Sequence, residues 1–321
     1  MLHTPAAGKE SRVLPTGLAP MLATAGALPP EDGRWAYEVK WDGVRALVAV
    51  DGDRVALRSR NDNDVTGAYP ELAAVRCGQP ALLDGEVVAF DEHGRPDFGL
   101  LQSRMHVGRP SGALRTCTPV ALVVFDVLHA GDRSLLDAPY DERRAALDAL
   151  GVRGAQVPGA FDAGGVLLAS TAAQGLEGVV AKRRDSRYAP GRRSDCWVKV
   201  KNLRRQSAVV VGWKPGDGGR AGRLGSLLLA VHADGGLVFA GHVGTGFSAA
   251  ELRRVEGLLA PLAADAPACA VPREHARVAR WVRPALVAEV EFTAWTREGR
   301  LRHPSYKGLR DDLDPTEVVR E

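Results

Sequence analysis

The sequence predicts a two-domain α+β protein, in which a domain built on antiparallel sheet is followed by a small β-barrel. Three observations lead to this prediction. The chain has 321 residues, more than a single hydrophobic core usually serves. Strand and helix patterns are mixed up to about Asn202. Beyond that residue, short alternating β patterns are separated by glycine-rich turns.

In the first domain, expected strands outnumber expected helices. Asp51-Gly52-Asp53 joins two alternating runs as a hairpin, and Ala81–Phe90 reads as strand–turn–strand around Asp84-Gly85. Pro119–Leu128 is almost wholly apolar, which indicates a buried strand. The other expected strands are Trp35–Trp41, Arg45–Val50, Val55–Arg60, Leu176–Arg183 and Cys196–Lys201, and the expected helices are Glu71–Arg76, Phe98–Met105 and Asp141–Leu150.

The second domain is expected to contain about five short strands and one helix. The helix, Ser248–Ala260, begins with a serine cap and has Glu251 three residues later. This composition fits an OB-fold barrel, a frequent platform for nucleic acids. The boundary is expected near residues 202–207, giving a flexible tail over 1–16, a first domain over 17–203 and an OB-fold domain over 204–321. The strands are expected at Ala208–Trp213, Ser226–His232, Leu237–Gly241 and Ala285–Ala294, the fourth of these being the last in the chain.

Composition excludes several classes of protein. No apolar run reaches the roughly 18–20 residues of a membrane span, and the N-terminus lacks the apolar core of a signal peptide. We therefore expect a cytoplasmic protein with no membrane partner. The four cysteines lie far apart without a C-x-x-C pair, which argues against a zinc site and a disulfide framework.

The basic residues are unevenly distributed. Between Lys182 and Arg205 the chain carries ten lysines and arginines against only Asp185 and Asp195. Such a run suits a polyanionic partner, because each phosphate contact releases counterions. A solvated surface explains the run equally well, and the sequence does not choose between the two.

Lysine is scarce, and its scarcity indicates a candidate nucleophile. Seven lysines stand among 42 basic residues, so arginine is used wherever charge alone suffices. An amine can lose its proton and attack, whereas a guanidinium stays protonated. Lys40 lies at the end of a strand pattern, shortly before the turn Asp42-Gly43.

Lys40, Asp42, Gly43 and Arg45 match the K-x-D-G-x-R motif, and the sequence here resembles the covalent nucleotidyltransferases, which comprise DNA ligases, RNA ligases and mRNA-capping guanylyltransferases. A lone K-x-D-G is a weak signal, but five further family motifs follow in order. They are Ser59-Arg60, Asp84-Gly85-Glu86, Phe125-Asp126, Glu177-Gly178-Val179-Val180-Ala181-Lys182 and Trp197-Val198-Lys199-Val200-Lys201.

The resemblance implies an adenylation (nucleotidyltransferase) domain in which Lys40 attacks the α-phosphate of ATP. It places Glu38 at the adenine edge, Phe125 against the adenine ring, and Lys199 and Lys201 on the α-phosphate. It also implies that Glu86 and Glu177 bind Mg²⁺ or Mn²⁺, since Mg²⁺ favours one or two carboxylates with phosphate oxygens, and that Arg45 and Arg60 contact ribose and the 5′-phosphate. Taken singly, Phe125 could be a core side chain, and both glutamates could be turn residues.

The C-terminal segment Arg302–Leu313 resembles the family's last motif, which orients the departing pyrophosphate. Arg310 and Asp312 match its R-x-D-K core, but Leu313 stands where the lysine usually is. We therefore expect Arg310 to carry the pyrophosphate task, helped by Lys307.

From Pro20 to Asp312 the chain resembles the ligase domain of bacterial ligase D, as in Phe98-Gly99-Leu100-Leu101-Gln102 and Gly241-His242-Val243-Gly244-Thr245-Gly246-Phe247. This resemblance implies a monomeric, nucleoid-associated DNA ligase that seals nicked or broken duplex DNA in end joining, with Ku and a separate repair polymerase or nuclease as partners. It also implies that the basic run Lys182–Arg205 contacts the DNA backbone. Either a stand-alone homologue or an excised domain is expected. Two alternatives remain: an RNA ligase or guanylyltransferase using the same lysine, and a catalytically idle nucleic-acid-binding module.

Overall fold

The structure is a computed structural model that describes residues 14–218, 221–233, 235–296 and 298–321. The chain divides into two compact units, the first ending at Asn202 and the second beginning at Leu203. Of the tail expected over 1–16, residues 1–13 lie outside the described residues, and 14–16 form neither helix nor strand. No helix in the described ranges is long and apolar enough to cross a bilayer.

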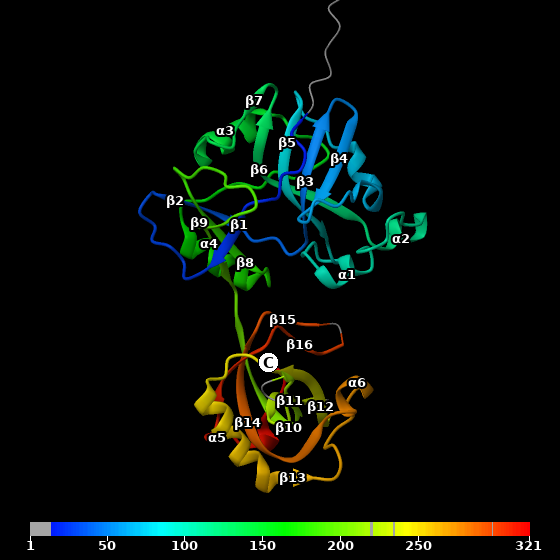
Figure 1. Ribbon diagram of the computed structural model, residues 1–321, viewed down its shortest axis with the longest axis vertical. Coiled ribbons are helices and arrows are strands. Elements are labelled where there is room, and N and C mark those ends of the chain that lie inside the picture. Colours follow the sequence, from blue (N-terminus) through cyan, green and yellow to red (C-terminus); the bar gives the residue numbers. More distant parts are fainter. Residues whose placement is uncertain (1–13, 219–220, 234, 297) are drawn as a thin grey trace, which may run out of the picture. The chain divides into compact units, whose positions relative to one another are not determined.

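The first unit contains a five-stranded antiparallel sheet (Figure 1). Its central strand, β5 (Ala81–Ala89), is continuous, so the expected turn at Asp84-Gly85 is wrong. Gly85 lies where the backbone of β6 approaches closely, since an added Cβ would come within 2.6 Å of the Val123 carbonyl oxygen. This glycine serves close strand packing. The strands across the sheet are β4 (Arg54–Ser59), β3 (Val44–Asp51), β5, β6 (Val120–Ala130) and β7 (Arg133–Ser134).

Short helices cover one face of this sheet. The expected helix Glu71–Arg76 is a 3-10 segment, Pro70–Ala74, and the helix expected over Phe98–Met105 ends early. It ends because Arg104 turns inward, fully buried, and donates to Thr118 and Ala68 carbonyl oxygens. The helices that pack on it are α1 (Phe98–Gln102) and α3 (Tyr140–Ala149), whereas α2 (Gly112–Cys117), which the sequence patterns did not predict, buries no residue.

A second, four-stranded sheet completes this unit. Helix α4 (Gly164–Ala173), also unpredicted, packs on it so closely that a Cβ on Gly164 would meet the Tyr37 ring at 2.5 Å. Between the two sheets lies a small core that includes Leu47, Leu128 and Trp197. The two sheets therefore face each other (Figure 1). The strands across the second sheet are β1 (Leu22–Ala25), β9 (Arg193–Lys201), β8 (Gly178–Arg183) and β2 (Trp35–Val39), with β1 parallel to β9.

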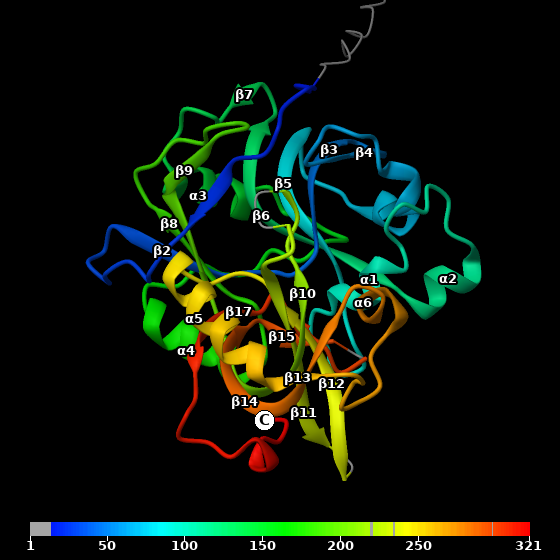
Figure 2. The same cartoon turned by 60° about the horizontal axis from the view of Figure 1, so that its bottom comes forward.

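The second unit is an antiparallel barrel with one longer helix, as the OB-fold prediction requires. Helix α5 (Ala249–Leu259) packs Leu252, Val255 and Leu259 into the barrel core, and Figure 2 shows it lying against the strands. Ser248 caps it as expected, accepting from the Glu251 amide at 3.1 Å. The strands are β10 (Arg204–Pro215), β11 (Leu224–Ala233), β12 (Gly236–Val243), β13 (Ala263–Ala264), β14 (Arg280–Phe292), β15 (Ala294–Trp295), β16 (Leu301–Arg302) and β17 (Ser305–Leu309), and the remaining helix is α6 (Arg273–Ala276).

Candidate active site

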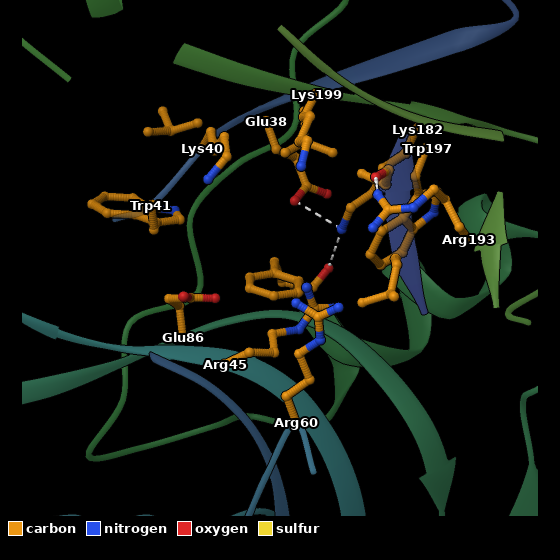
Figure 3. A pocket seen from close by; sticks show the side chains of 15 residues that line it. Glu38, Lys40, Trp41, Arg45, Arg60, Glu86, Lys182, Arg193, Trp197 and Lys199 are labelled. Atoms are coloured by element: carbon orange, nitrogen blue, oxygen red, sulfur yellow. Dashed lines mark hydrogen bonds and ion pairs between the residues drawn. The ribbon is translucent and has the colours of Figure 1, made fainter. Parts of the chain in front are cut away.

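A pocket in the first unit is lined by residues of both sheets (Figure 3). Seven of the residues singled out in the sequence line it: Glu38, Lys40, Arg45, Arg60, Glu86, Phe125 and Lys199. Its other lining residues are Leu22, Ala23, Val39, Trp41, Val180, Lys182, Arg193 and Trp197.

Lys40 lies immediately after β2, and its amide donates to the Gly178 carbonyl at 2.9 Å, which ties the strand end to β8. Its ammonium forms an ion pair with Glu177. Lys201 reaches the other oxygen of the same carboxylate at 2.9 Å. Glu177 therefore bridges Lys40 and Lys201, although neither Glu177 nor Lys201 lines the pocket itself.

Glu177 is held ionised between these two lysines. Burial alone would raise its pKa, but the charge and hydrogen bond of Lys40, and then those of Lys201, outweigh burial and lower the pKa below its usual value. The nucleophile candidate thus rests as a charged partner of Glu177. It must leave that ion pair before it can attack.

Lys199 adds to a concentration of positive charge. On the register of β8 and β9 it lies opposite Val180, two residues from Lys201 on the same strand face. Burial lowers its pKa, and the neighbouring charges of Lys40 and Arg193 lower it further. Such a cluster favours an anionic ligand.

Glu86 differs from Glu177 because no lysine or arginine of the described residues pairs with it. It lies on β5, opposite Arg45 on β3. Desolvation raises its pKa to about 7, although the charges of Arg45 and Lys40 oppose this rise. In Figure 3 its carboxylate points toward the region of Trp41 and Lys40. A bound cation would therefore stabilise the ionised form of Glu86 more than that of Glu177, which already has two lysine partners.

Arg45 has a structural partner that the motif did not predict. Its guanidinium holds both oxygens of the fully buried Asp84, at 2.5 and 2.6 Å, and Tyr188 donates to the same carboxylate at 2.6 Å. The guanidinium also lies 4.6 Å from the centroid of the Phe125 ring. This bidentate pair fixes one face of Arg45 and leaves it at the edge of the pocket.

Phe125 belongs both to the core and to the pocket, and its predicted contact with adenine stays a prediction. Its ring packs on the core between the sheets, edge-on to Trp197 with centroids 6.5 Å apart, and it also lines the pocket. Arg60, just beyond the end of β4, lines the same pocket as Arg45 (Figure 3).

Lys182 shows where the analysis of the basic run was wrong. It is 1% exposed and cannot contact DNA as expected. Its ammonium pairs with Glu38 at 2.9 Å inside the pocket. The signal was available in the alternation of β8, because Val180 and Lys182 share a strand face.

Much of the remaining basic run is neutralised by ion pairs, one of them within the run and the others with acids distant in sequence. Arg183 pairs with Asp185, Arg184 with Asp141 and Asp162, and Arg187 with Asp137. The run is therefore not a continuous surface of unpaired cations. Arg193, expected to contact DNA, lines the pocket and donates to the Ala23 carbonyl.

Arg310 belongs to the second unit, where it follows β17. It donates to Asp312 at 2.7 and 2.8 Å, and to Glu289 at 3.3 Å. Lys307, its expected helper, pairs with Glu291 at 2.6 Å. Both cations are surface groups in ion pairs.

Comparisons with known proteins give the family. The model of the ATP dependent DNA ligase domain matches residues 20–201, and that of the ATP dependent DNA ligase C terminal region matches residues 220–313. DNA ligase C of Mycobacterium tuberculosis is 35% identical over 337 residues, which cover 93% of this chain and 91% of that protein. The chain belongs to the ATP-dependent DNA ligase family.

Similarity is stronger to part of a longer relative. The multifunctional non-homologous end joining protein LigD of Mycobacterium bovis is 45% identical over 312 residues, covering 95% of this chain. The chain spans only 40% of the length of that relative. The crystal structure of the ligase domain from M. tuberculosis LigD matches with 42% identity and a TM-score of 0.54, covering 95% of this chain and 98% of that one. The predicted fold class, a nucleotidyltransferase domain followed by an OB-fold domain, is confirmed.

Proposed function

We propose that this ligase works through a lysyl-AMP intermediate on Lys40 and seals 5′-phosphate/3′-hydroxyl nicks in DNA. The observation that carries the proposal is the position of the Lys40 amine, which pairs with Glu177 beside a pocket lined by Glu38, Glu86 and several cationic side chains. A nucleophilic amine needs such a setting, with groups that orient it and charges that stabilise a transferring phosphoryl group.

In the first step, the deprotonated Lys40 nitrogen attacks the α-phosphorus of ATP. A P–N bond forms, the bond from the α-phosphorus to the bridging oxygen breaks, and pyrophosphate leaves with that electron pair, while the nitrogen releases one proton to water. Lys199 and Lys201 would stabilise the charge on the α-phosphate. Glu38 and Phe125 would hold the base, while Arg45 and Arg60 would contact the ribose.

The pocket also fits a divalent cation. Glu86 in the pocket and Glu177 beside it would offer oxygen ligands, since Mg²⁺ or Mn²⁺ takes one or two carboxylates together with phosphate oxygens and water. Glu86, which is desolvated and pairs with no cationic side chain in the described ranges, suits this role. When bound, the cation would withdraw charge from the phosphates.

In the second step, an oxygen of the 5′-phosphate attacks the same phosphorus, the P–N bond breaks, and Lys40 regains a proton. The 3′-hydroxyl oxygen then attacks the 5′-phosphorus, and AMP leaves as the phosphodiester forms. Arg45 and Arg60 would meet the 5′-phosphate during these steps.

The biological setting is proposed from relatives. Because the matched proteins include LigD, named for non-homologous end joining, we infer a role at broken or nicked DNA ends in repair. Ku and a separate polymerase or nuclease would be its partners. The proposed domain limits are 17–203 and 204–321.

The direct test is intact mass after incubation with ATP and Mg²⁺. The expected result is an increase of about 329 Da, one AMP on the enzyme, as covalent nucleophilic catalysis requires. Labelled ATP and GTP, each followed by nicked DNA or nicked RNA, separate a DNA ligase from an RNA ligase and from a guanylyltransferase.

Lys40→Arg is the sharpest variant, because arginine keeps the positive charge beside Glu177 but cannot act as a nucleophile. We expect it to fold and to gain no mass. Lys214→Arg, a matched change on β10 of the second unit, should gain AMP as the wild type does. Nick sealing by Lys40→Arg at the wild-type rate would contradict the proposal.

A further inference from the structure

The carboxylate of Glu38 is held from both sides. Lys182 Nζ lies 2.9 Å from Oε2, and the Tyr140 hydroxyl donates to Oε1 at 2.5 Å. All three side chains are almost inaccessible, with Glu38 itself 4% exposed. Since each carboxylate oxygen can accept a further hydrogen bond, the group is fixed in place yet can still serve a ligand.

Lys182 is itself immobilised. Its ammonium donates to the Phe125 carbonyl at 2.9 Å and lies within 4.4 Å of the Trp197 ring centroid and 4.8 Å of the Phe125 ring centroid. In Figure 3 the dashed line from Lys182 reaches Glu38 within the pocket. Through Lys182, one oxygen of the Glu38 carboxylate is therefore linked to β6, the strand that carries Phe125.

Tyr140 anchors the other side. It is the first residue of α3. Arg143 of the same helix donates to both carboxylate oxygens of the buried Asp126 on β6, at 2.8 and 3.0 Å. Burial, reinforced by the charge of Glu38, holds the pKa of Tyr140 far above its usual value, so the hydroxyl stays protonated and acts as a donor. Helix α3 thus sets the orientation of a carboxylate on a different strand.

We propose that Tyr140 is a positioning residue that determines base selectivity, by aiming the Glu38 carboxylate at the 6-amino group of adenine. The inference rests on the proposed function, in which Glu38 lies at the adenine edge. A carboxylate acceptor that is fixed in place favours binding of a base that carries a hydrogen-bond donor. A base lacking that amino group leaves the desolvated carboxylate without its partner.

Removing the hydroxyl should release the carboxylate. In Tyr140→Phe, Oε1 loses its donor, and the carboxylate turns toward the ammonium of Lys182. The experiment measures enzyme–nucleotide formation by intact mass, over a range of concentrations of ATP and of purine riboside triphosphate, which lacks the 6-amino group. We expect the concentration of ATP for half-maximal rate to rise about tenfold, the usual order for one hydrogen bond to a charged group, with little change in the maximal rate. The preference for ATP over the purine analogue should narrow by a similar factor.

Tyr37→Phe is the matched control. Tyr37 precedes Glu38 on β2, but its hydroxyl donates to the Pro29 and Pro30 carbonyls at 3.0 Å. Tyr37→Phe also removes one tyrosine hydroxyl, from the residue next to Glu38. Its preference for ATP over the purine analogue should equal that of the wild type. Because the preference is a ratio within one preparation, a smaller folded fraction does not alter it.

The outcomes separate the two ideas. A wild-type protein that gains no AMP refutes the proposed function. A wild-type protein that gains AMP, together with a Tyr140→Phe variant of unchanged preference, refutes the positioning role alone. A Tyr140→Phe variant that seals a pre-adenylylated nick normally while its base preference narrows supports it.

Discussion

The glycine in the turn after Lys40 is dictated by close packing. A Cβ on Gly43 would lie 2.2 Å from the Val87 carbonyl oxygen and 2.8 Å from Cγ of Glu86. Both neighbours belong to β5, which carries one of the two carboxylates of the pocket. This glycine therefore brings the Lys40 segment and Glu86 together, so the motif encodes a packing distance as well as a turn.

Gly43→Ala should separate these two segments. Relieving the backbone clash requires β5 or the turn to move, which typically costs about 1–3 kcal/mol in the free energy of unfolding, and displaces Glu86. We expect the rate of AMP addition to fall at least roughly tenfold, as small misplacements at a reacting centre do. Intact mass against time and chemical denaturation measure the two effects.

Gly108→Ala is the control for Gly43→Ala. Gly108 lies in a loop of the same unit, and its added Cβ meets nothing within 4 Å. It should change stability by no more than about 0.5 kcal/mol. If Gly43→Ala behaved like Gly108→Ala in both measurements, close packing would not explain the glycine.

At the residue scale, sequence reasoning succeeded for residues whose chemistry is local. Lys40, Glu86 and Lys199 were identified from motifs, and the structure brings them to one pocket. Lys182 was misassigned because its partner, Glu38, depends on how two strands pair. Tyr140 was missed altogether, since nothing near it in the chain indicates that its hydroxyl meets a carboxylate about a hundred residues away.

At the scale of elements, sequence patterns predicted the longer strands and the capped helix. Segments that contain glycine were predicted wrongly or not at all. Asp84-Gly85 looked like a turn but lies within β5, because the absence of a side chain at Gly85 lets β6 approach. Helix α4 escaped prediction because its segment, GGVLLASTAA, opens with two glycines and lacks a polar stripe. Tertiary packing decided both cases.

Two glycines of the second unit, one of them in helix α5, test how the backbone setting determines the effect of alanine. Gly257 lies exposed within this helix, and its added Cβ would meet nothing within 4 Å. Gly257→Ala should raise the free energy of unfolding by about 0.5–1 kcal/mol, because alanine loses less conformational entropy in a helix. Chemical denaturation monitored by circular dichroism measures the change.

Gly246 provides the opposite case in the same unit. It has φ +91°, and a Cβ there would lie 2.3 Å from the Tyr306 carbonyl oxygen. Gly246→Ala should lower stability, as strain and overlap both predict. Stabilisation by both alanines would show that backbone entropy alone governs these sites.

At the scale of the whole molecule, the proposed chemistry is divided between two units. The pocket with Lys40 belongs to the first unit, and Arg310 to the second. Leu313, at the position where the family motif has lysine, packs against the barrel core. The proposed pyrophosphate role therefore falls to Arg310, and it concerns only the first step, in which pyrophosphate leaves.

This division predicts a defect confined to one step. Arg310→Ala should slow AMP addition from ATP roughly 100-fold, the usual cost of removing one group that stabilises transition-state charge. It should seal a nick that already carries AMP at nearly the wild-type rate, because no pyrophosphate leaves in that reaction. Arg283→Ala, which removes a guanidinium bonded only to the Pro261 carbonyl at 3.2 Å within the described residues, should leave both rates unchanged. Equal loss of rate in both assays would mean that Arg310 supports the fold of the barrel or the binding of DNA. Another cation would then have to orient the pyrophosphate.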